Sequence, residues 1–336
     1  MQTKNLARET IVFLGGYVLL WLLLATAVWF LCPLPLKWLA PLLILIMGGA
    51  IAFFVYPALP VFVTIYGLNR RLLMAEKIAH FSLNLHEVFS PGSPETAFQL
   101  ALFAEVLRGQ ARFAEAEATV RQAIDLYNSD QNLSKKTKYQ RVEAEGLIYE
   151  LLGSVLRDQG KYSEALKAGK KGCELLEQRK NELSAAAGAG QQEVVNRALA
   201  SSYYELARTL NITGQADDAI TLLHLSLDLR GEETPPDRYK ASVLAELSKA
   251  YLMSGEFKEA ECAASKAQTN LSHSEQAEEQ LARARVNLAI ADVLRQGPEK
   301  TAEERAAITP LRAEALRIRK QWLAAKDPEL LDIGGG

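Results

Sequence analysis

Residues 160–169 read GKYSEALKAG, and this short phrase returns along the chain in altered form. The pattern is a turn residue, an aromatic residue or Ala two positions later, an acidic residue and a closing Ala. Its relatives are GQADDAI at 214–220, GEFKEAE at 255–261 and ARFAEAE at 111–117. The closing Ala residues are 49, 54 and 41 residues apart. A period of this length predicts stacked helical pairs that are joined by tight turns.

The phrase at 160–169 lies between two helix-like runs, GLIYELLGSVLRDQ before it and SEALKAGKKGCELLEQ after it. Apolar residues recur on one helical face of each run. Gly153, Ala165 and Gly172 are small, and a large side chain at those positions would force two packed helices apart. The sequence therefore predicts helix pairs whose backbones approach each other closely.

The same residues resemble the tetratricopeptide repeat (TPR). Three copies follow the order of positions of that repeat: Tyr149, Leu152, Gly153, Leu156, Gly160, Tyr162, Ala165 and Gly172; Tyr203, Leu206, Ala207, Leu210, Gly214, Ala216, Ala219 and Ser226; Leu244, Leu247, Ser248, Tyr251, Gly255, Phe257, Ala260 and Ala267. A weaker copy precedes them, and a looser copy follows, whose ALRIR...DPE ending resembles the longer repeats of kinesin light chains. The resemblance covers residues 96–326 and implies an all-α, right-handed solenoid of about four to five helix pairs.

The beginning of the chain has a different character. Residues 11–31, IVFLGGYVLLWLLLATAVWFL, carry no charge and match the roughly 20 residues that a helix needs to cross a bilayer. Thirteen of these 21 residues are Leu, Ile, Val or Phe, which favours insertion by about 4–8 kcal/mol. A second uncharged run follows at 39–68. The two runs predict a transmembrane helical hairpin with spans at about 11–31 and 39–66.

A cleaved signal peptide is the alternative for this region. The first run is longer than the apolar core of such a peptide, and the second run follows at once, so the hairpin is favoured. The loop between the runs carries Lys37 alone. Lys4 and Arg8 precede the hairpin, and further basic residues follow it. The positive-inside rule therefore predicts an integral membrane protein with two spans, whose N-terminus and repeat array both lie in the cytoplasm.

Composition argues against several classes of function. The chain has 38 basic and 40 acidic residues, and no block of basic residues indicates nucleic-acid binding. Cys32, Cys173 and Cys262 are too far apart for a disulfide framework or a metal site, and we expect them to be buried or lipid-facing. The four histidines are scattered, and no glycine-rich phosphate loop is present. We therefore expect no enzymatic activity, no catalytic residue, no cofactor and no metal.

A peptide-binding groove is the better prediction. In the resembled family, the first helix of each pair lines the concave groove of the solenoid. Matching position by position places the following residues there: Arg157, Tyr204, Arg208, Asn211, Lys249 and Asn287. Cations suit carboxylates, Asn suits backbone groups and Tyr suits apolar contacts. The clamp with which some family members hold chaperone C-termini is not reproduced, because Ala101 and Glu105 stand where that clamp has Lys and Asn.

The predicted organisation has four parts: a membrane hairpin (1–68), a juxtamembrane helix and linker (69–95), a TPR array (96–326) and a tail (327–336). The predicted function is that of a membrane-anchored scaffold or adaptor, which binds a partner protein or peptide in the concave groove. One alternative is a self-associating structural membrane protein, and hence a homo-oligomer. Another is a secretion or transport component whose hairpin is functional, although uncharged spans argue against an ion or substrate path.

Overall fold

The computed structural model of the chain describes residues 59–68, 70–89, 94–129, 135–183, 189–231, 237–298 and 301–331. The chain divides into two compact units, 1–63 and 64–336. The first predicted span and the larger part of the second lie outside the described residues. The end of the second predicted span falls in helix α3, Leu59–Leu68. Within the described ranges, no helix is both long enough and apolar enough to cross a membrane.

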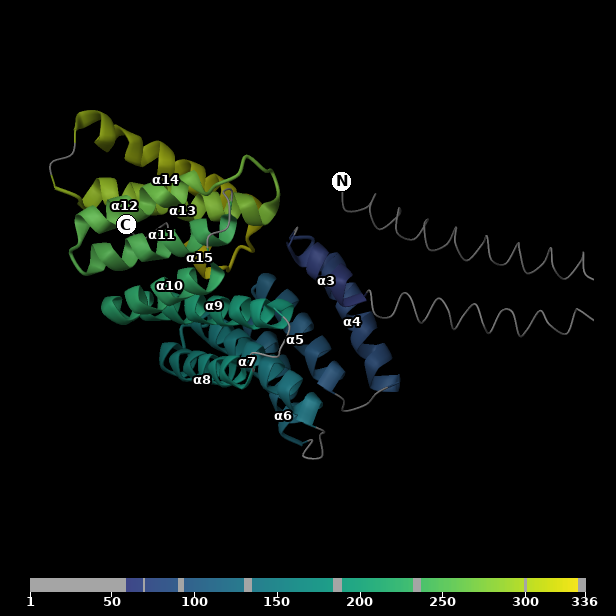
Figure 1. Cartoon of the computed structure of the whole chain (residues 1–336). Helices are drawn as coiled ribbons and strands as arrows, with labels where there is room; N and C mark the ends of the chain where they lie inside the picture. The colour runs from purple at the N-terminus through teal and green to yellow at the C-terminus, as the bar shows by residue number, and fades with distance from the viewer. Residues whose placement is uncertain are drawn as a thin grey trace, which may run out of the picture. The chain divides into compact units, whose positions relative to one another are not determined.

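All regular secondary structure described in the unit 64–336 is α-helical. After α3, the helices are α4 Leu72–Phe89, α5 Pro94–Gly109, α6 Phe113–Ser129, α7 Lys135–Asp158, α8 Tyr162–Glu182, α9 Ala189–Ile212, α10 Ala216–Arg230, α11 Arg238–Met253, α12 Phe257–Thr269, α13 Ala277–Gln296, α14 Ala302–Trp322 and α15 Pro328–Leu331. In the described part of the chain, α5 to α14 make five consecutive pairs (Figure 1). The prediction of an all-α repeat solenoid is confirmed.

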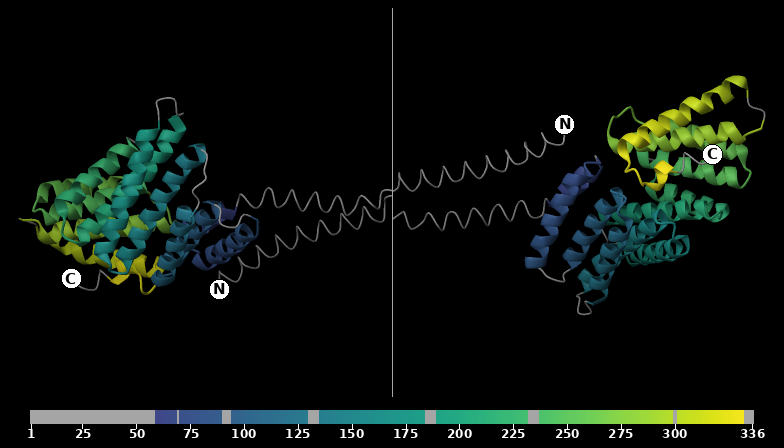
Figure 2. Two further views of the ribbon diagram at one scale, coloured as in Figure 1. Left: turned by 90° about the horizontal axis from the view of Figure 1, so that it is seen from below. Right: turned by 180° about the vertical axis from the view of Figure 1, so that it is seen from behind.

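The helix pairs are arranged in two layers. Each helix from α4 to α14 packs against the next one along the chain. In addition, α5 contacts α7, α7 contacts α9, α9 contacts α11 and α11 contacts α13. These odd-numbered helices, α5 to α13, form the inner layer, and the even-numbered helices α6 to α14 form the outer layer. The pairs follow one another in the order of the sequence (Figure 1 and Figure 2).

The recurring phrase makes one kind of turn. Gly160, Gly214 and Gly255 have φ angles of +77°, +78° and +77°, in the left-handed region that residues with a Cβ rarely adopt. After the first of these glycines, the amide of Lys161 donates to the carbonyl of Leu156 at 2.9 Å. This bond closes the end of the preceding helix and directs the chain into the next one. Glycine is therefore favoured here by the turn geometry and not by a lack of space.

The first copy makes the same turn without a glycine. Ala111 has a φ of +58°, and the amide of Arg112 donates to the carbonyl of Leu107 at 3.0 Å, as in the glycine-containing turns. A Cβ in the left-handed region costs roughly 1–2 kcal/mol. The packing of the α5–α6 pair thus imposes a strained backbone on Ala111.

The small residues of the repeat allow helices to touch through their backbones. A Cβ added at Gly172 of α8 would lie 2.9 Å from the oxygen of Gly146 and 3.0 Å from the nitrogen of Glu150, both on α7. A Cβ at Gly153 would lie 3.1 Å from the nitrogen of Gly169. The prediction that the α7–α8 pair packs closely is therefore confirmed.

The cysteines differ in their surroundings. Cys173 is buried between α8 and α9, and burial raises the pKa of its thiol to about 12. Cys262 is exposed, which corrects the expectation that it would be buried. It lies on α12, an outer-layer helix with one face in solvent. Cys32 lies outside the described residues.

Candidate functional site

The six residues predicted for the groove all lie on inner-layer helices. Arg157 is on α7; Tyr204, Arg208 and Asn211 are on α9; Lys249 is on α11 and Asn287 on α13. The structure brings three of them to one place. Arg157, Tyr204 and Arg208 line a polar cavity of about 430 Å³, called the inner cavity below. The other three do not line it.

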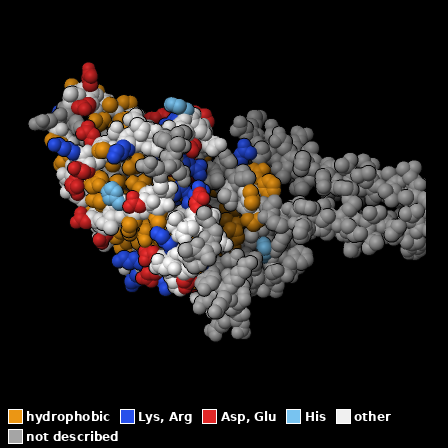
Figure 3. Space-filling view, viewed as in Figure 1, with side chains coloured by type: hydrophobic (Ala, Val, Ile, Leu, Met, Phe, Trp, Pro, Cys, Tyr) orange, Lys and Arg blue, Asp and Glu red, His pale blue; other side chains and the backbone are white. Residues whose placement is uncertain are grey.

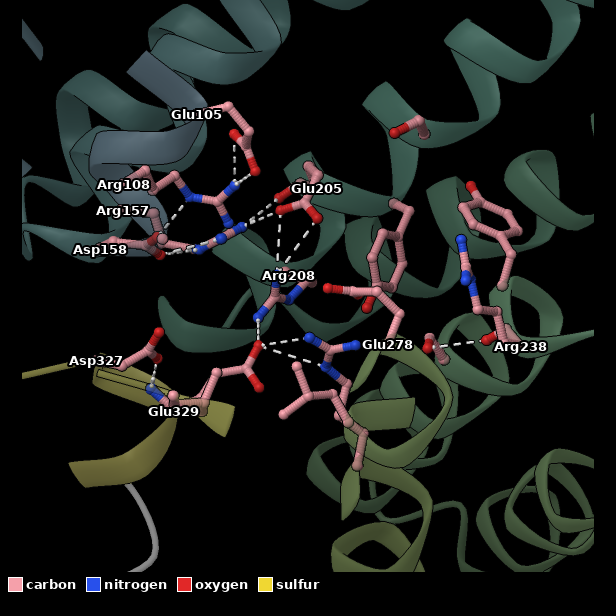
Figure 4. Close-up of a pocket in the computed structure, with 18 of the residues that line it drawn as sticks. Glu105, Arg108, Arg157, Asp158, Glu205, Arg208, Arg238, Glu278, Asp327 and Glu329 are labelled. Atoms are coloured by element: carbon pink, nitrogen blue, oxygen red, sulfur yellow. Dashed lines mark hydrogen bonds and ion pairs between the residues drawn. The ribbon is translucent and has the colours of Figure 1, made fainter. Parts of the chain in front are cut away.

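Glu205 lies at the centre of the charges around the inner cavity. Its carboxylate accepts hydrogen bonds from Arg157 Nη1 at 2.5 Å and Arg208 Nη1 at 3.2 Å (Figure 4). It also accepts from Ser154 Oγ at 3.2 Å. Burial by itself raises the pKa of Glu205, but Arg208 and Arg157 outweigh this effect and hold the pKa well below its usual value. Glu205 is therefore ionised and neutralises two arginines.

The ion pairs continue from Glu205 toward the start of the array. Arg157, whose side chain is only 2% exposed, also pairs with Asp158 at 3.1 Å. Asp158 in turn accepts from Arg108 Nε at 2.8 Å, and Arg108 pairs with Glu105 at 3.0 Å. This line of alternating charges crosses from α5 through α7 to α9. It therefore connects three inner helices at the wall of the cavity.

On the other side, the network reaches the C-terminal end of the array. Glu329 of α15 accepts from Arg208 Nη2 at 2.6 Å and from Arg285 Nη2 at 3.0 Å. Arg319 Nη2 lies 3.7 Å from its second carboxylate oxygen, and Arg319 also donates to the backbone carbonyl of Glu329. Burial raises the pKa of Glu329, but Arg285, Arg208 and Arg319 together hold it well below its usual value. Arg208 thus lies between the carboxylates of Glu205 and Glu329 (Figure 4).

The two ends of the unit 64–336 meet beside the inner cavity. Arg70, which precedes α4, donates from Nε to the carbonyl of Trp322 at 3.0 Å. Its guanidinium also lies 3.9 Å from Asp327. Both Arg70 and Asp327 line the cavity. The segment 327–331, which belongs to the part predicted as a tail, is therefore one wall of the cavity.

Asn211 and Lys249 share a partner outside the inner cavity. Asn211 Nδ2 donates to the backbone carbonyl of Glu246 at 3.1 Å, and Lys249 Nζ lies 3.0 Å from the carboxylate of Glu246. Asn287 is half-buried on α13. The Nδ2 of Asn211 and the ammonium of Lys249 are thus bonded within the chain, whereas the buried Oδ1 of Asn211 has no partner among the described residues. Their contact with a peptide stays a prediction.

A second site is an open groove that sequence reasoning missed. It has a volume of about 1340 Å³ and is lined by α5, α7 and α9, together with Arg179 of α8. Its exposed apolar side chains are Phe98 (44%), Leu147 (37%) and Val194 (56%), one from each of these helices. The groove is called the apolar groove below. The sequence could have indicated this groove. Phe98, Leu147 and Val194 lie on the first helix of each pair, but outside the positions that form the core of the repeat.

Glu150 lies at the floor of the apolar groove. Its Oε1 accepts from Ser201 Oγ at 2.9 Å, whereas its buried Oε2 has no hydrogen-bond partner among the described residues. Burial raises the pKa of Glu150, the neighbouring Glu205 raises it further, and the result is about 8. The carboxyl group is therefore mostly protonated at pH 7. It offers a proton donor within the groove, whose lining also includes the charged residues Glu105, Arg108 and Glu143.

The described residues show no arrangement for metal chemistry, since they contain no group of three His, Cys, Asp or Glu side chains that could hold a metal ion. The face of the molecule seen in Figure 3 carries basic and acidic side chains that alternate with hydrophobic ones. This mixture fits the nearly balanced charge of the chain.

The comparison with known families identifies the repeats. Residues 198–272, which run from α9 to the loop after α12, match the family model described as Tetratricopeptide repeat. This part of the chain therefore consists of tetratricopeptide repeats. No curated protein sequence matches the chain significantly.

Several solved structures are similar to the chain. BtubC (BKLC) from P. vanneervenii shares 14% identity and has a TM-score of 0.52, with 75% of this chain and 91% of that chain covered. A putative kinesin light chain with TPR-like repeats from Podosopora anserina shares 15% identity and has a TM-score of 0.44, with 63% of this chain and 92% of that chain covered. Pseudomonas aeruginosa PilF shares 14% identity and has a TM-score of 0.45, with 83% of this chain and 96% of that chain covered. The likeness to BtubC concerns the fold alone.

Proposed function

We propose that this protein is a membrane-anchored TPR scaffold, which binds a segment of a partner protein in the apolar groove. The observation that carries the proposal is the groove itself. Phe98, Leu147 and Val194 expose 44%, 37% and 56% of their surfaces on three successive inner helices. Exposed apolar side chains that gather in a groove mark protein-interaction sites. TPR arrays are typically non-catalytic, and we assign no reaction to this chain.

The size and lining of the groove favour a peptide over a small molecule. Pockets for small ligands measure about 300–1,000 Å³. The apolar groove, at about 1340 Å³, is larger and open to solvent. A segment with large apolar side chains would cover Phe98, Leu147 and Val194, while a backbone carbonyl oxygen of the segment could accept the proton of Glu150. The partner segment is therefore apolar with an exposed hydrogen-bond acceptor.

The uncharged runs at 11–31 and 39–68 support the membrane anchor in this proposal. The array begins at Pro94, only 26 residues after the second run, so an anchor would hold the groove close to the bilayer. The few basic residues that flank the runs favour a cytoplasmic array. A protein of this kind would gather its partner at the cytoplasmic surface of a membrane and raise the local concentration of that partner there.

The test is co-purification from native membranes in mild detergent. The full chain is compared with Leu147→Glu, which places a charge in the groove. The matched control is Leu225→Glu, because Leu225 is 41% exposed on the outer helix α10. We expect a partner that the parent and the control retain and that Leu147→Glu loses. If the same proteins co-purified with the parent, Leu147→Glu and Leu225→Glu, the proposal that the groove binds the partner would be refuted. If only copies of the chain were recovered, in an oligomer of fixed size, self-association would be supported.

A further inference from the structure

We infer that the exposed face of helix α4 docks on the surface of a bilayer that contains anionic lipids, and that this contact sets the orientation of the repeat array. The face consists of Leu73, Lys77 and Phe81 of α4, with Arg71 immediately before the helix, and is called the α4 outer face below. The inference rests on the membrane anchor of the proposed function. It adds a lipid-binding surface that is separate from both the apolar groove and the inner cavity.

Helix α4 has two faces that differ in their contacts. Its buried residues recur every three or four positions, which places them on one face of the helix: Ala75, Ala79, Ser82, Leu83 and His86. This face packs against α5, where Ser82 Oγ donates to Gln99 Oε1 at 2.8 Å. Leu73, Lys77 and Phe81 are four positions apart and lie on the opposite face. All three are exposed to solvent.

The α4 outer face combines apolar and basic side chains. Leu73 and Phe81 expose 59% and 55% of their surfaces. Arg71 and Lys77 are also exposed, and neither forms an ion pair with any residue that the structure describes. The face therefore offers two uncompensated positive charges beside two large apolar side chains. This is the composition of helices that lie in a membrane interface.

The position of α4 in the sequence favours a lipid surface as the occupant. The uncharged run at 39–68 ends only three residues before Arg71. Three residues span at most about 11 Å, and the head-group layer on each side of a bilayer is roughly 5–8 Å thick. If the run crosses the bilayer, α4 therefore begins within or beside the head-group layer. Anionic head groups there would bind Arg71 and Lys77, while Leu73 and Phe81 would reach the boundary of the acyl chains.

A second copy of the chain fits the α4 outer face less well. In a symmetric dimer the same face would meet itself. Arg71 and Lys77 of one copy would then lie near the same residues of the other, and like charges that are brought together weaken an interface. The one acidic residue of the stretch 70–84, Glu76, is already paired with Arg112 at 2.5 Å. An anionic bilayer supplies the negative charge that a second copy lacks.

Helix α4 is firmly joined to the array, so its contact with lipid would orient the array as well. Glu76 accepts from Gln110 Nε2 at 2.8 Å and from Arg112 Nη1 at 2.5 Å, and both donors belong to the turn between α5 and α6. Just before α4, Arg70 Nε donates to the carbonyl of Trp322, the last residue of α14, at 3.0 Å. These bonds connect α4 to both ends of the repeat array.

The test measures how close single positions lie to lipid. The full chain is reconstituted in vesicles of equal parts of phosphatidylcholine and phosphatidylglycerol, or of phosphatidylcholine alone. Asn84→Cys, on the exposed side of α4, carries a fluorescent label, and Cys32→Ser and Cys262→Ser prevent labelling elsewhere. Cys173 is buried and is left in place. In the anionic vesicles, quenching by brominated lipid should be at least twofold stronger at position 84 than for the same label at Leu225→Cys on the outer helix α10.

Removing the cations tests the role of charge. Each Lys or Arg near an anionic surface strengthens binding by a factor of about five. Arg71→Gln and Lys77→Gln should therefore each lower the ratio of docked to free α4, measured from the quenching at position 84, by about that factor. Vesicles of phosphatidylcholine alone should weaken the quenching as well. The matched control Lys258→Gln removes an exposed cation of α12 and should leave the quenching unchanged, and thermal melting shows whether each variant is folded.

Flotation of the vesicles in a density gradient separates this inference from the proposed anchor. If the chain floats with the vesicles but position 84 is quenched no more than position 225, the anchor stands and the docking of α4 is overturned. Equal quenching in the parent and in folded Lys77→Gln would overturn it too. Disulfide cross-linking of two chains through Asn84→Cys, in place of quenching, would show that a second copy covers the face. A chain that does not float would overturn the anchor and the docking together, while Leu147→Glu tests the groove independently.

Discussion

Replacing Glu205 with Gln removes the negative charge that two arginines of the inner cavity share. The carboxylate lies 2.5 Å from Arg157 Nη1 and 3.2 Å from Arg208 Nη1. The side chain of Arg157 is 2% exposed. After the substitution, Asp158 is the one carboxylate left to balance its charge in the ion-pair network. The substitution therefore leaves a buried cation with too little negative charge around it. We expect Glu205→Gln to destabilise the array.

The magnitude follows from the burial of the pair. Removing one partner of a buried ion pair costs about 3–5 kcal/mol. Gln keeps an oxygen that can accept from Ser154, and Arg157 keeps Asp158, so we expect about 3 kcal/mol. For a unit of this size, that loss corresponds to a Tm lower by roughly 6–12 °C. The control Glu193→Gln breaks an exposed pair with Arg197, whose two side chains are 61% and 54% exposed, and should cost less than about 0.5 kcal/mol.

The assay is thermal unfolding followed by circular dichroism at several pH values. The pKa of Glu205 is depressed in the folded chain, so its contribution is present above the unfolded pKa near about 4.3 and is lost as the pH falls. The difference between parent and Glu205→Gln should therefore be full at pH 7 and shrink as the pH falls below about 4. Equal melting of Glu205→Gln and Glu193→Gln at pH 7 would refute the reasoning.

Three further predictions concern single positions. Gly172→Val should lower the free energy of unfolding by about 2–3 kcal/mol in a denaturant titration, because its Cβ would lie 2.9 Å from the oxygen of Gly146; an unchanged midpoint would contradict the close packing. Ala111→Gly should raise the free energy of unfolding by about 0.5–1 kcal/mol, since φ is +58° there, and a lower Tm would argue against strain. The pKa of Glu150 is raised to about 8, so the stability of its neutral form is lost as the pH rises through that value. Glu150→Gln should accordingly match the parent below about pH 4.3, the usual pKa of Glu, and gain on it up to about pH 8, by at most about 5 kcal/mol, whereas parallel pH profiles would contradict the raised pKa.

Much of the fold could be predicted because the repeat encodes it locally. Turn glycines such as Gly160 are favoured where φ is positive, and they recur between the two helices of a pair. Small residues such as Gly153 and Gly172 recur where two backbones touch. Both signals depend on short stretches of sequence. The looser last copy also forms a pair, α13 and α14, although Pro298 lies between them.

The candidate sites were harder to predict because their contacts are distant in the sequence. The resemblance placed Arg157 and Arg208 on inner helices, and the structure agrees. It could not reveal that Arg157 pairs with Glu205, 48 positions away, or that Arg208 pairs with Glu329, 121 positions away. A single acidic residue near the C-terminus gives no signal of its own. Its importance depends on the curvature that brings Trp322 next to Arg70.

The central claim is that the apolar groove binds a partner protein, and site-specific photo-crosslinking tests it most directly. A photoreactive amino acid replaces Leu147 in the groove or, as the control, Leu225 on the outer helix α10. Irradiation of intact cells is followed by purification of the chain and identification of the linked proteins. We predict that position 147 links to one protein other than the chain itself, and that position 225 does not. Links from position 147 only to copies of the chain, or the same products from both positions, would contradict the claim.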